Sequence, residues 1–254
     1  MSLHRFFVDV RLDLREDTSD RQTVELSHDA LGHLRAVRLE RGERVVFVDE
    51  EGASFETTFL ALEGDAVSVC DVHRADLELP YDVTLFQGVS KGDRMDLVMR
   101  AGCELGLSGI VPIRTARCVV RLDERKAAAR AQRWRKIARP AAEQSGRQTV
   151  PDIPCPLSFP EALERARGLD VVLCPYEDAT SGSVASARAG VDPSARVGLF
   201  VGPEGGFALD EVEALSGLGA RIVTLGPTIL RTETAGVVAS ALVIYELGGL
   251  GRAR

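Results

Sequence analysis

Two short stretches near the C-terminus decide the fold: GPEGGF at residues 202–207 and LGPTILRTETA at residues 225–235. Each follows or continues a short apolar run, residues 195–201 and 221–225, of the kind that forms a buried strand. Between them, residues 209–218 carry apolar side chains at helical spacing. The order strand, loop, helix, strand, loop, helix predicts a parallel α/β sheet. Both loops leave strands at the edge where open α/β sheets bind ligands.

The glycines of residues 202–206 have two explanations. Glycine has no Cβ, so this backbone can approach a flat or crowded ligand closely. A tight turn without any ligand explains the same residues, because proline and glycine are ordinary turn residues. The occurrence of two such loops, each at a strand end, favours a ligand site over a simple turn.

Length and composition restrict the class of protein. A chain of 254 residues can form one large domain or two modest ones. The longest apolar stretch, about residues 235–244, is shorter than the roughly 20 residues of a membrane span, and no apolar signal segment follows residues 1–5. The five cysteines form no CxxC pair, and histidines and cysteines lack the spacing of a zinc site. We therefore expect a cytoplasmic protein with reduced thiols, no membrane partner and no metal.

Positive charge is concentrated in one segment of an otherwise acidic chain. The formal net charge is -7, yet residues 114–149 contain 11 basic and only 3 acidic side chains. Such a segment is typical of a nucleic-acid site, although most runs of charge are simply solvated helix faces. Because few acids are available to pair with these arginines, we expect contact with phosphate.

The N-terminal part has the pattern of a small β-barrel. Residues 27–39 predict a helix with Ser27 as its N-cap, and acidic, glycine-containing turns separate short apolar segments. The strands expected there are residues 3–10, 44–48, 54–60 and 66–72. Residues 75–80 are the expected linker, so the predicted domains are residues 1–74 and 75–254.

The second part opens with a βαβ pattern and continues as an α/β domain. A long basic helix is expected at residues 125–145, with Trp134 buried on its apolar stripe rather than free to stack on a base. The last helix, residues 232–247, is apolar nearly all round and is expected to be buried. The other elements expected are strands at 83–87, 110–113 and 170–174 and helices at 95–105 and 161–167.

Several of these stretches, taken together and in order, resemble the small-subunit ribosomal RNA uridine-N3 methyltransferases, a family of the SPOUT superfamily. They are GPEGGF at 202–207, LGPTILRTETA at 225–235, KGDRMD at 91–96, ELG at 104–106, AEQSGR at 142–147 and HLRAVR at 33–38. The resemblance covers essentially the whole chain. Any one motif alone indicates only the wider superfamily.

This resemblance implies a specific fold and activity. The fold is an N-terminal PUA-like β-barrel followed by a SPOUT α/β domain with a C-terminal trefoil knot, and the protein is expected to be a homodimer. The methyl donor is S-adenosylmethionine, and the acceptor is N3 of one uridine in small-subunit ribosomal RNA or in the assembled subunit. The residues expected to bind the donor are Leu199, Val201, Gly202, Pro203, Gly205, Gly206, Leu225, Gly226, Ile229, Leu230, Thr234 and Ala235.

Two positions depart from the family pattern. The family usually has lysine in a QKAxELG segment, but residues 100–106 here read RAGCELG. After the GGF motif the family usually has serine or threonine, where this chain has Ala208. The second change removes the oxygen expected to cap the following helix, at a cost of about 0.5–2 kcal/mol.

The chemistry requires a cation and a base. Uracil N3 carries a proton at neutral pH, so the site should stabilise a developing uracil anion, and Arg231 is the first candidate for this role. Glu204 or Glu233 is expected to take the proton. Each residue also has a purely structural explanation. Glu204 would hold its turn through backbone hydrogen bonds, and Glu233 would be an acidic residue favoured by the helix dipole at the helix N-terminus. Arg231 would form a salt bridge with Glu233.

The candidate RNA-binding residues come from three segments of the chain. They are Lys91 and Arg94, then Arg139, Gln144 and Arg147 around the end of the basic helix, and Arg35 and Arg38 in the N-terminal domain. Two other functions remain open. One is a SPOUT enzyme acting on another base or a ribose 2′-hydroxyl; the other is a non-catalytic RNA-binding or ribosome-assembly protein, which would not need the intact glycine loop.

Overall fold

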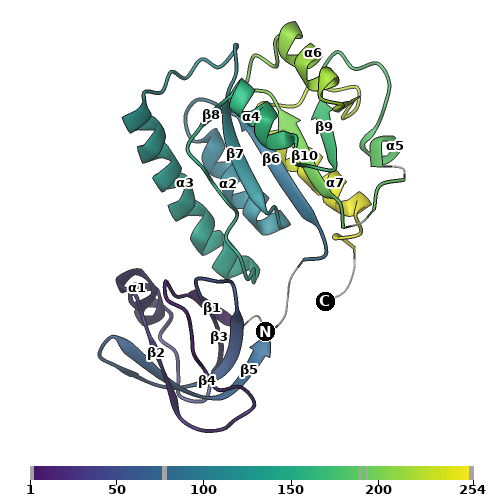
Figure 1. Cartoon of the computed structure of the whole chain (residues 1–254). Coiled ribbons are helices and arrows are strands. Elements are labelled where there is room, and N and C mark those ends of the chain that lie inside the picture. The colour runs from purple at the N-terminus through teal and green to yellow at the C-terminus, as the bar shows by residue number, and fades with distance from the viewer. Residues whose placement is uncertain (1–2, 76–78, 189, 193, 252–254) are drawn as a thin grey trace. The chain divides into compact units, whose positions relative to one another are not determined.

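The computed structural model describes residues 3–75, 79–188, 190–192 and 194–251 (Figure 1). The chain divides into two compact units, the first formed by residues 1–78 with 142–149 and the second by residues 79–141 with 150–254. The expected linker at residues 75–80 lies partly outside the described residues. Segment 142–149, which begins in the last turn of the long basic helix, joins the first unit, and the sequence pattern does not indicate this.

The first unit contains a five-stranded sheet. Its strand order is β1-β3-β4-β5-β2, with β1 parallel to β3 and the other neighbours antiparallel. The strands are β1 (His4–Phe7), β2 (Gln22–Glu25), β3 (Arg44–Val48), β4 (Ser54–Glu63) and β5 (Ala66–Ala75). Sequence analysis missed β2, whose four residues bury only one side chain, Val24, and so give little apolar signal.

Helix α1 (His28–Val37) begins where its capping residue predicts. The hydroxyl of Ser27 accepts a hydrogen bond from the Ala30 N–H at 3.4 Å, which satisfies one of the free N–H groups of the first turn. The helix ends at Arg38, which has a left-handed conformation with φ of 55°. Leu34 packs from α1 into the core of this unit with Phe6 and Phe47.

The second unit contains a six-stranded sheet in the order β11-β9-β10-β6-β7-β8. Every neighbouring pair is parallel, which confirms the predicted α/β class. The strands are β6 (Asp82–Gly88), β7 (Gly109–Arg114), β8 (Leu157–Ser158), β9 (Val171–Pro175), β10 (Arg196–Val201) and β11 (Arg221–Val223). Because the strands are parallel, the ends of β9, β10 and β11 meet at one edge of the sheet.

Helices cover both faces of this sheet (Figure 1). On one face Leu85 and Leu199 share a core with residues of α2 and α7. On the other, Phe86 and Phe200 stack with ring centroids 4.3 Å apart, in a core shared with α4 and α6. The helices are α2 (Arg94–Leu105), α3 (Glu124–Ser145), α4 (Phe159–Ala166), α5 (Val184–Arg188), α6 (Leu209–Gly217) and α7 (Thr232–Glu246).

Two of the helices test specific expectations. Helix α3 contains Pro140 without ending there, and Trp134 is only 2% exposed, which confirms its predicted burial. Helix α7 was expected to be buried on all sides, and this is wrong for its last turns. Leu242 is 39% exposed and Tyr245 is 61% exposed, so one side of α7 faces outward. Among the described residues, none of the helices is both long and apolar enough to cross a membrane.

Candidate functional site

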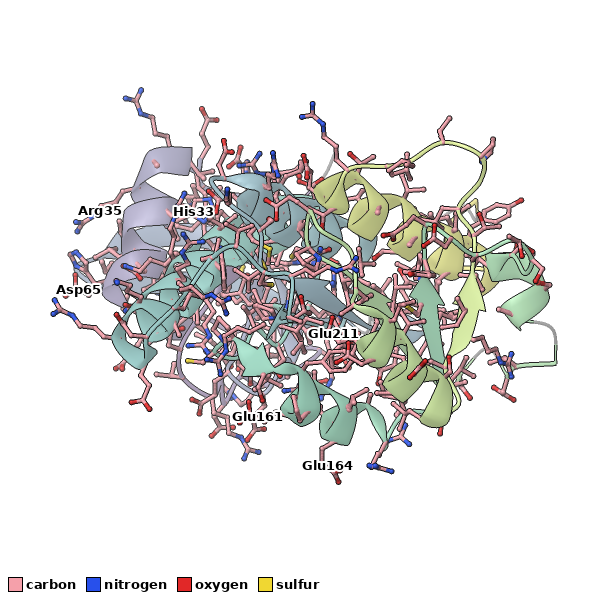
Figure 2. All side chains as sticks on the ribbon, turned by 90° about the horizontal axis from the view of Figure 1, so that it is seen from above. His33, Arg35, Asp65, Glu161, Glu164 and Glu211 are labelled. Carbon is pink, nitrogen blue, oxygen red and sulfur yellow. The ribbon has the colours of Figure 1, made fainter. Side chains whose placement is uncertain are left out.

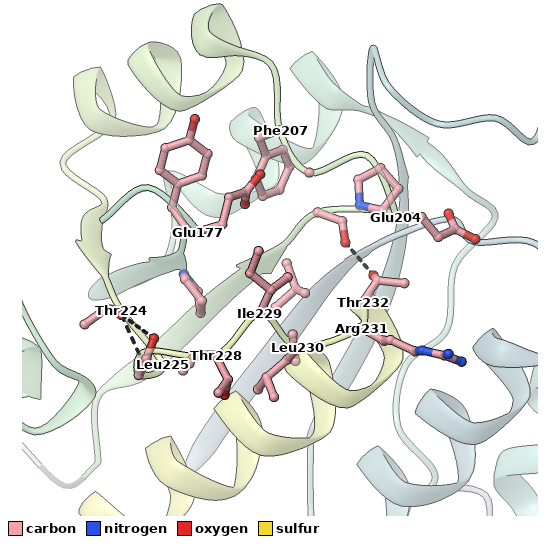
Figure 3. Close-up of a pocket in the computed structure, with 18 of the residues that line it drawn as sticks. Glu177, Glu204, Phe207, Thr224, Leu225, Thr228, Ile229, Leu230, Arg231 and Thr232 are labelled. Atoms are coloured by element: carbon pink, nitrogen blue, oxygen red, sulfur yellow. Dashed lines mark hydrogen bonds between the residues drawn. The ribbon is translucent and has the colours of Figure 1, made fainter. Parts of the chain in front are cut away.

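A cavity of about 540 Å³ opens at the edge of the second sheet where β9, β10 and β11 end (Figure 3). Most of its wall comes from three loops, the residues after each of these strands. Arg94 at the start of α2 and the first turns of α7 complete it. Nine of the residues predicted to bind the donor are in its walls: Val201, Gly202, Pro203, Gly206, Leu225, Gly226, Ile229, Leu230 and Ala235. The two loops that the sequence singled out therefore face the same space.

The glycine loop after β10 is closely packed against itself and its neighbours. The Gly206 N–H donates to the Pro203 carbonyl at 2.9 Å, and Gly206 has φ of +66°, a conformation that favours glycine. A Cβ on Gly202 would lie 2.9 Å from the carbonyl carbon of Gly206. The glycines are thus needed by the turn itself as well as leaving room on the cavity side.

A buried chain of hydrogen bonds ties this loop to β6 and α7. The side-chain amide of Gln87 donates to the Thr232 hydroxyl at 2.8 Å. That hydroxyl donates to the Gly202 carbonyl at 2.5 Å (Figure 3). Both side chains are buried. The start of α7 is therefore fixed against the glycine loop, and the cavity wall is formed before any ligand binds.

Charged side chains gather at one end of the cavity. Arg94 lines it and forms an ion pair with Glu204 at 2.6 Å, and its Nε lies 3.7 Å from Glu233 Oε1. The Lys91 N–H also donates to Glu204 Oε1, at 2.9 Å. Burial alone raises the pKa of Glu204, but these donors, with its own N–H, outweigh burial and hold the pKa below its ordinary value. Glu204 is therefore a carboxylate with its charge stabilised.

A further carboxylate, Glu177, lies across the cavity from Glu204 (Figure 3). It follows β9, and its Oε1 would lie 2.4 Å from a Cβ placed on Gly206. Sequence analysis missed Glu177, although its place directly after a predicted strand of the sheet was a signal that could have found it. The cavity therefore has Glu177 on one side, Glu204 on the opposite side, and apolar side chains between the two carboxylates.

Comparison with known proteins identifies the family. A family model described as RNA methyltransferase domain matches residues 77–244. The chain belongs to this RNA methyltransferase family. It is 31% identical over 251 residues to ribosomal RNA small subunit methyltransferase E of Bacillus subtilis, covering 96% of this chain and 97% of that one. The resemblance noted in the sequence is confirmed at the level of this family.

Two solved structures of similar proteins contain a methyl donor. One is ribosomal RNA small subunit methyltransferase E of Neisseria gonorrhoeae bound to S-adenosyl methionine, with 33% identity, a TM-score of 0.80, and coverage of 96% of this chain and 97% of that chain. The other is a putative methyltransferase of Legionella pneumophila in complex with the cofactor SAM, with 30% identity, a TM-score of 0.79, and coverage of 96% and 98%.

Three residues predicted to bind the donor lie elsewhere than in the cavity walls. Leu199 is fully buried in the core between the sheet and α2 and α7. Gly205 faces away, since its carbonyl accepts a hydrogen bond from Arg117 at 3.1 Å and an added Cβ would lie 3.1 Å from the Arg117 Cβ. Thr234 is exposed in the first turn of α7. None of these three residues therefore lines the cavity.

The three predicted catalytic residues are placed close together but in different settings. Glu204 and Arg231 line the cavity, whereas Glu233 is not one of its lining residues and is only 9% exposed. Arg231 is exposed and precedes α7 as its N-cap residue. Among the ion pairs of the described residues, the partner of Glu233 is Arg94 and not Arg231.

The departure at Ala208 is partly compensated. Ala208 is the N-cap of α6 and makes no side-chain cap bond. Glu211, on α6 (Figure 2), still accepts a hydrogen bond from the Ala208 N–H at 2.9 Å, and its other oxygen accepts from the Ala116 N–H at 2.8 Å. The carboxylate half of the capping box therefore survives and ties α6 to the segment after β7.

The predicted RNA-binding residues are divided between the two units. Lys91, Arg94 and Arg139 belong to the second unit, whereas Gln144, Arg147, Arg35 and Arg38 belong to the first. Arg35 projects from the exposed side of α1 (Figure 2), and Arg147 donates to the Thr149 hydroxyl at 3.2 Å. Arg94 differs from the rest, because it lines the cavity and pairs with two carboxylates. Within the described ranges, no group of three metal-ligating side chains is present.

Proposed function

We propose that this protein transfers the methyl group of S-adenosylmethionine to N3 of a uridine in small-subunit ribosomal RNA. The observation that carries the proposal is the cavity at the ends of β9, β10 and β11, built by both loops that resemble the family's donor loops. The relative from Bacillus subtilis is named for methylation of small-subunit ribosomal RNA, and two similar structures hold the donor. The uridine and its N3 atom come from the resemblance of the sequence.

The residues of the cavity suit S-adenosylmethionine. Gly202 and Gly206 leave the wall without side chains, so backbone groups can reach a purine base or ribose. Leu225, Ile229 and Leu230 supply apolar surface for the same ligand. The carboxylate of Glu177 suits ribose hydroxyls or a positive charge. When bound, the donor supplies a methyl group on a positively charged sulfur.

The protein's task in this reaction is to hold and deprotonate the acceptor. Methyl transfer needs the N3 lone pair in line with the methyl group, and positioning of this kind can lower the barrier by several kcal/mol. The lone pair becomes available only as the N3 proton leaves. Arg231 is proposed to donate to the carbonyl beside N3, and Glu204 or Glu233 to receive the proton.

Contact with RNA is proposed along the basic segment and the residues near the cavity. Arg139 and Arg147 carry charges suited to phosphate, with Gln144, Lys91, Arg94, Arg35 and Arg38 as further contacts. Neutralising phosphates releases counterions, so binding weakens as salt rises. A variant with Arg139→Ala and Arg147→Ala is expected to bind the RNA more weakly and with a lower salt slope, and an unchanged slope would move the RNA site elsewhere.

The finer features of the architecture belong to the same proposal. We infer that the five-stranded sheet of the first unit is a PUA-like barrel, that the C-terminal part of the second unit forms a trefoil knot, and that the protein is a homodimer. The start of α7 lies against the glycine loop through the Thr232–Gly202 bond, which supports a chain that returns beside that loop. The proposed substrate implies a cytoplasmic site of action.

Transfer of a labelled methyl group tests the function. The protein is incubated with labelled S-adenosylmethionine and either deproteinised small-subunit RNA or assembled small subunits, and the RNA is digested to nucleosides. Label in 3-methyluridine is the expected result. Label in another base or in a 2′-O-methyl nucleoside would contradict the assignment of uridine N3 as the acceptor. Donor binding without transfer to either RNA would contradict the enzymatic function. Gly202→Val, whose side chain would collide with the Gly206 backbone and displace the glycine loop, serves as the inactive control.

A further inference from the structure

We propose that Glu233 accepts the N3 proton of the acceptor uridine, and that Arg94, held by Glu204, positions Glu233 and faces the acceptor. The proposal rests on the function proposed above. It chooses between the two candidates for the base and adds Arg94, beside Arg231, as a residue that positions it. It is carried by a cluster of three charged side chains from three separate elements: the start of α2, the glycine loop and the first turn of α7.

Arg94 is the centre of this cluster. It is the first residue of α2 and lines the cavity, with 36% of its side chain exposed. Its Nη1 donates to Glu204 at 2.6 Å, and its Nε lies 3.7 Å from Glu233. A guanidinium has five N–H donors in a fixed planar arrangement, so a carboxylate on one side leaves others for a substrate oxygen. Arg94 can therefore contact an acceptor base while it stays paired.

The two carboxylates differ in the hydrogen bonds that they already accept. Glu204 Oε1 already accepts from the Lys91 N–H and from Arg94, and these bonds hold its pKa below the ordinary value. Glu233 Oε2 is buried and has no hydrogen-bond partner among the described residues. A carboxylate oxygen without a donor can receive a proton without giving up an existing bond. This difference favours Glu233 as the base and Glu204 as the residue that fixes Arg94.

The position of Glu233 on α7 suits the starting state of a base. It lies in the first turn of the helix, where the N-terminal end of the helix dipole stabilises a negative charge. Its side chain keeps 11% exposure, and its Oε1 is the oxygen that lies nearest to the Arg94 Nε. Contacts of catalytic groups are often long before substrate binds and tighten in the complex. The 3.7 Å separation of Arg94 and Glu233 fits such a loose pair.

The charges balance in the proposed step. The N3–H bond breaks and its proton moves to the Glu233 carboxylate, while the N3 electron pair forms the new bond to the methyl carbon. The bond between methyl and sulfur breaks with its electron pair remaining on sulfur, so the sulfonium becomes a neutral thioether. A negative carboxylate and a positive sulfonium thus disappear together, which a site of low dielectric favours.

The test compares carboxylate-to-amide variants that keep the size of each side chain. Glu233→Gln removes the proposed base, Arg94→Lys keeps a charge but removes the planar donors, and Glu213→Gln is a matched change at an exposed site on α6. Each variant is assayed in single turnover on assembled small subunits, with donor affinity measured by calorimetry. Subunits whose RNA carries 5-fluorouridine provide a second acceptor, because fluorine at C5 makes N3 more acidic.

We expect Glu233→Gln to slow methyl transfer by about 100-fold or more, with donor affinity changed less than about threefold. Arg94→Lys is expected to slow it by about 100-fold, and Glu213→Gln not at all. The 5-fluorouridine acceptor should recover at least about tenfold of the Glu233→Gln loss, since less help is then needed to remove the proton.

The outcomes separate this assignment from the proposed function. Wild-type transfer to uridine N3 with an unaffected Glu233→Gln variant overturns the assignment and leaves the function in place. A slow Glu233→Gln variant that 5-fluorouridine does not rescue also overturns it, because the side chain then has only a structural role. If the wild-type protein forms no 3-methyluridine at all, the proposed function itself is wrong.

Discussion

The two loops that form the cavity differ in how firmly the protein holds them. The glycine loop at 202–207 is tied down by an internal turn, by the Thr232 hydroxyl on Gly202 and by Arg94 on Glu204. The loop at 225–231 is open: Ile229 is 89% exposed, and a Cβ on Gly226 would meet nothing within 4 Å. One wall of the cavity is thus formed in advance, and the other has room to move.

This contrast indicates a division of labour in donor binding. A fixed wall supplies hydrogen-bonding groups in place, so little ordering is required when the ligand meets it. An open wall with an exposed apolar side chain buries apolar area when it closes over a ligand, which favours binding. The conformational entropy lost when the loop becomes ordered offsets part of that free energy. Specific recognition is therefore expected mainly from the glycine loop, and enclosure mainly from the second loop.

The largest effect is expected from breaking the fixed wall through Gly88, the last residue of β6. A Cβ at Gly88 would lie 2.3 Å from the Pro203 nitrogen and 2.7 Å from the Gly202 carbonyl carbon, both backbone atoms. Gly88→Ala should therefore displace the loop, destabilise the protein by about 1–3 kcal/mol and weaken donor binding about 100-fold. Urea unfolding and calorimetry with S-adenosylmethionine measure the two effects.

Gly217, the last residue of α6, provides the matched control. A Cβ there meets nothing within 4 Å, so Gly217→Ala should leave donor affinity unchanged and slightly stabilise the protein. If Gly88→Ala binds the donor as well as Gly217→Ala does, the glycine loop is not a rigid wall of the cavity.

Much of the second unit was predictable because its elements are locally consistent. The apolar runs at β6, β9 and β10 lie between clear loop signals, and the predicted bounds differ from the observed ones by at most one residue at either end. The short elements β2, β8 and α5 were not predicted. They have two to five residues, too few to show a period, and their positions depend on partners far away in the sequence.

The site was predictable only where a loop carries its own signal. Gly202 and Gly206 could be found from the sequence, because a glycine cluster after an apolar run has a known use. Glu177 and the pairing of Arg94 with Glu233 could not, since each depends on which strand ends and helix starts lie side by side. Gly88 carries no signal of its own in the sequence, because its close contact with Pro203 is a property of the tertiary fold.

Glu177 tests whether the fixed wall recognises polar groups of the donor. Glu177 lines the cavity beside Gly206, and a hydrogen bond to a charged group contributes about 1.5–3 kcal/mol. We expect Glu177→Ala to weaken the binding of S-adenosylmethionine by about 10- to 100-fold, as measured by calorimetry. Glu177→Gln keeps the shape and should lose less. Equal affinity of all three proteins would mean that the donor does not reach this side of the cavity.

Ile229 tests the open wall, with a smaller expected effect. Since the side chain is 89% exposed without ligand, Ile229→Ala should change the free energy of unfolding by less than about 0.5 kcal/mol. Closure over the donor should bury it, so the same variant is expected to bind S-adenosylmethionine about 5- to 20-fold more weakly. Thermal unfolding with and without the donor measures both. A variant that loses stability without the donor would show that this loop is already packed.

The smallest effect concerns the charge that anchors the glycine loop. The donors from Lys91 and Arg94 hold the pKa of Glu204 below its ordinary value of 4.5, although burial acts in the opposite direction. A carboxyl group whose pKa is lowered by folding stabilises the protein above its unfolded pKa, and this contribution is lost as pH falls through the folded pKa. Glu204→Gln should therefore cost a few tenths of a kcal/mol at about pH 7, after screening by solvent.

The difference in free energy of unfolding between the wild-type protein and Glu204→Gln should fall to zero as pH drops below the lowered pKa of Glu204, where both side chains are neutral. Urea unfolding of the two proteins at about pH 7, 5 and 3 measures this change. A difference that persists unchanged at the lowest pH would mean that Glu204 holds its loop by shape and neutral hydrogen bonds. The fixed wall would then stay fixed in acid, and the contrast with the open loop at 225–231 would owe nothing to the Arg94 charge.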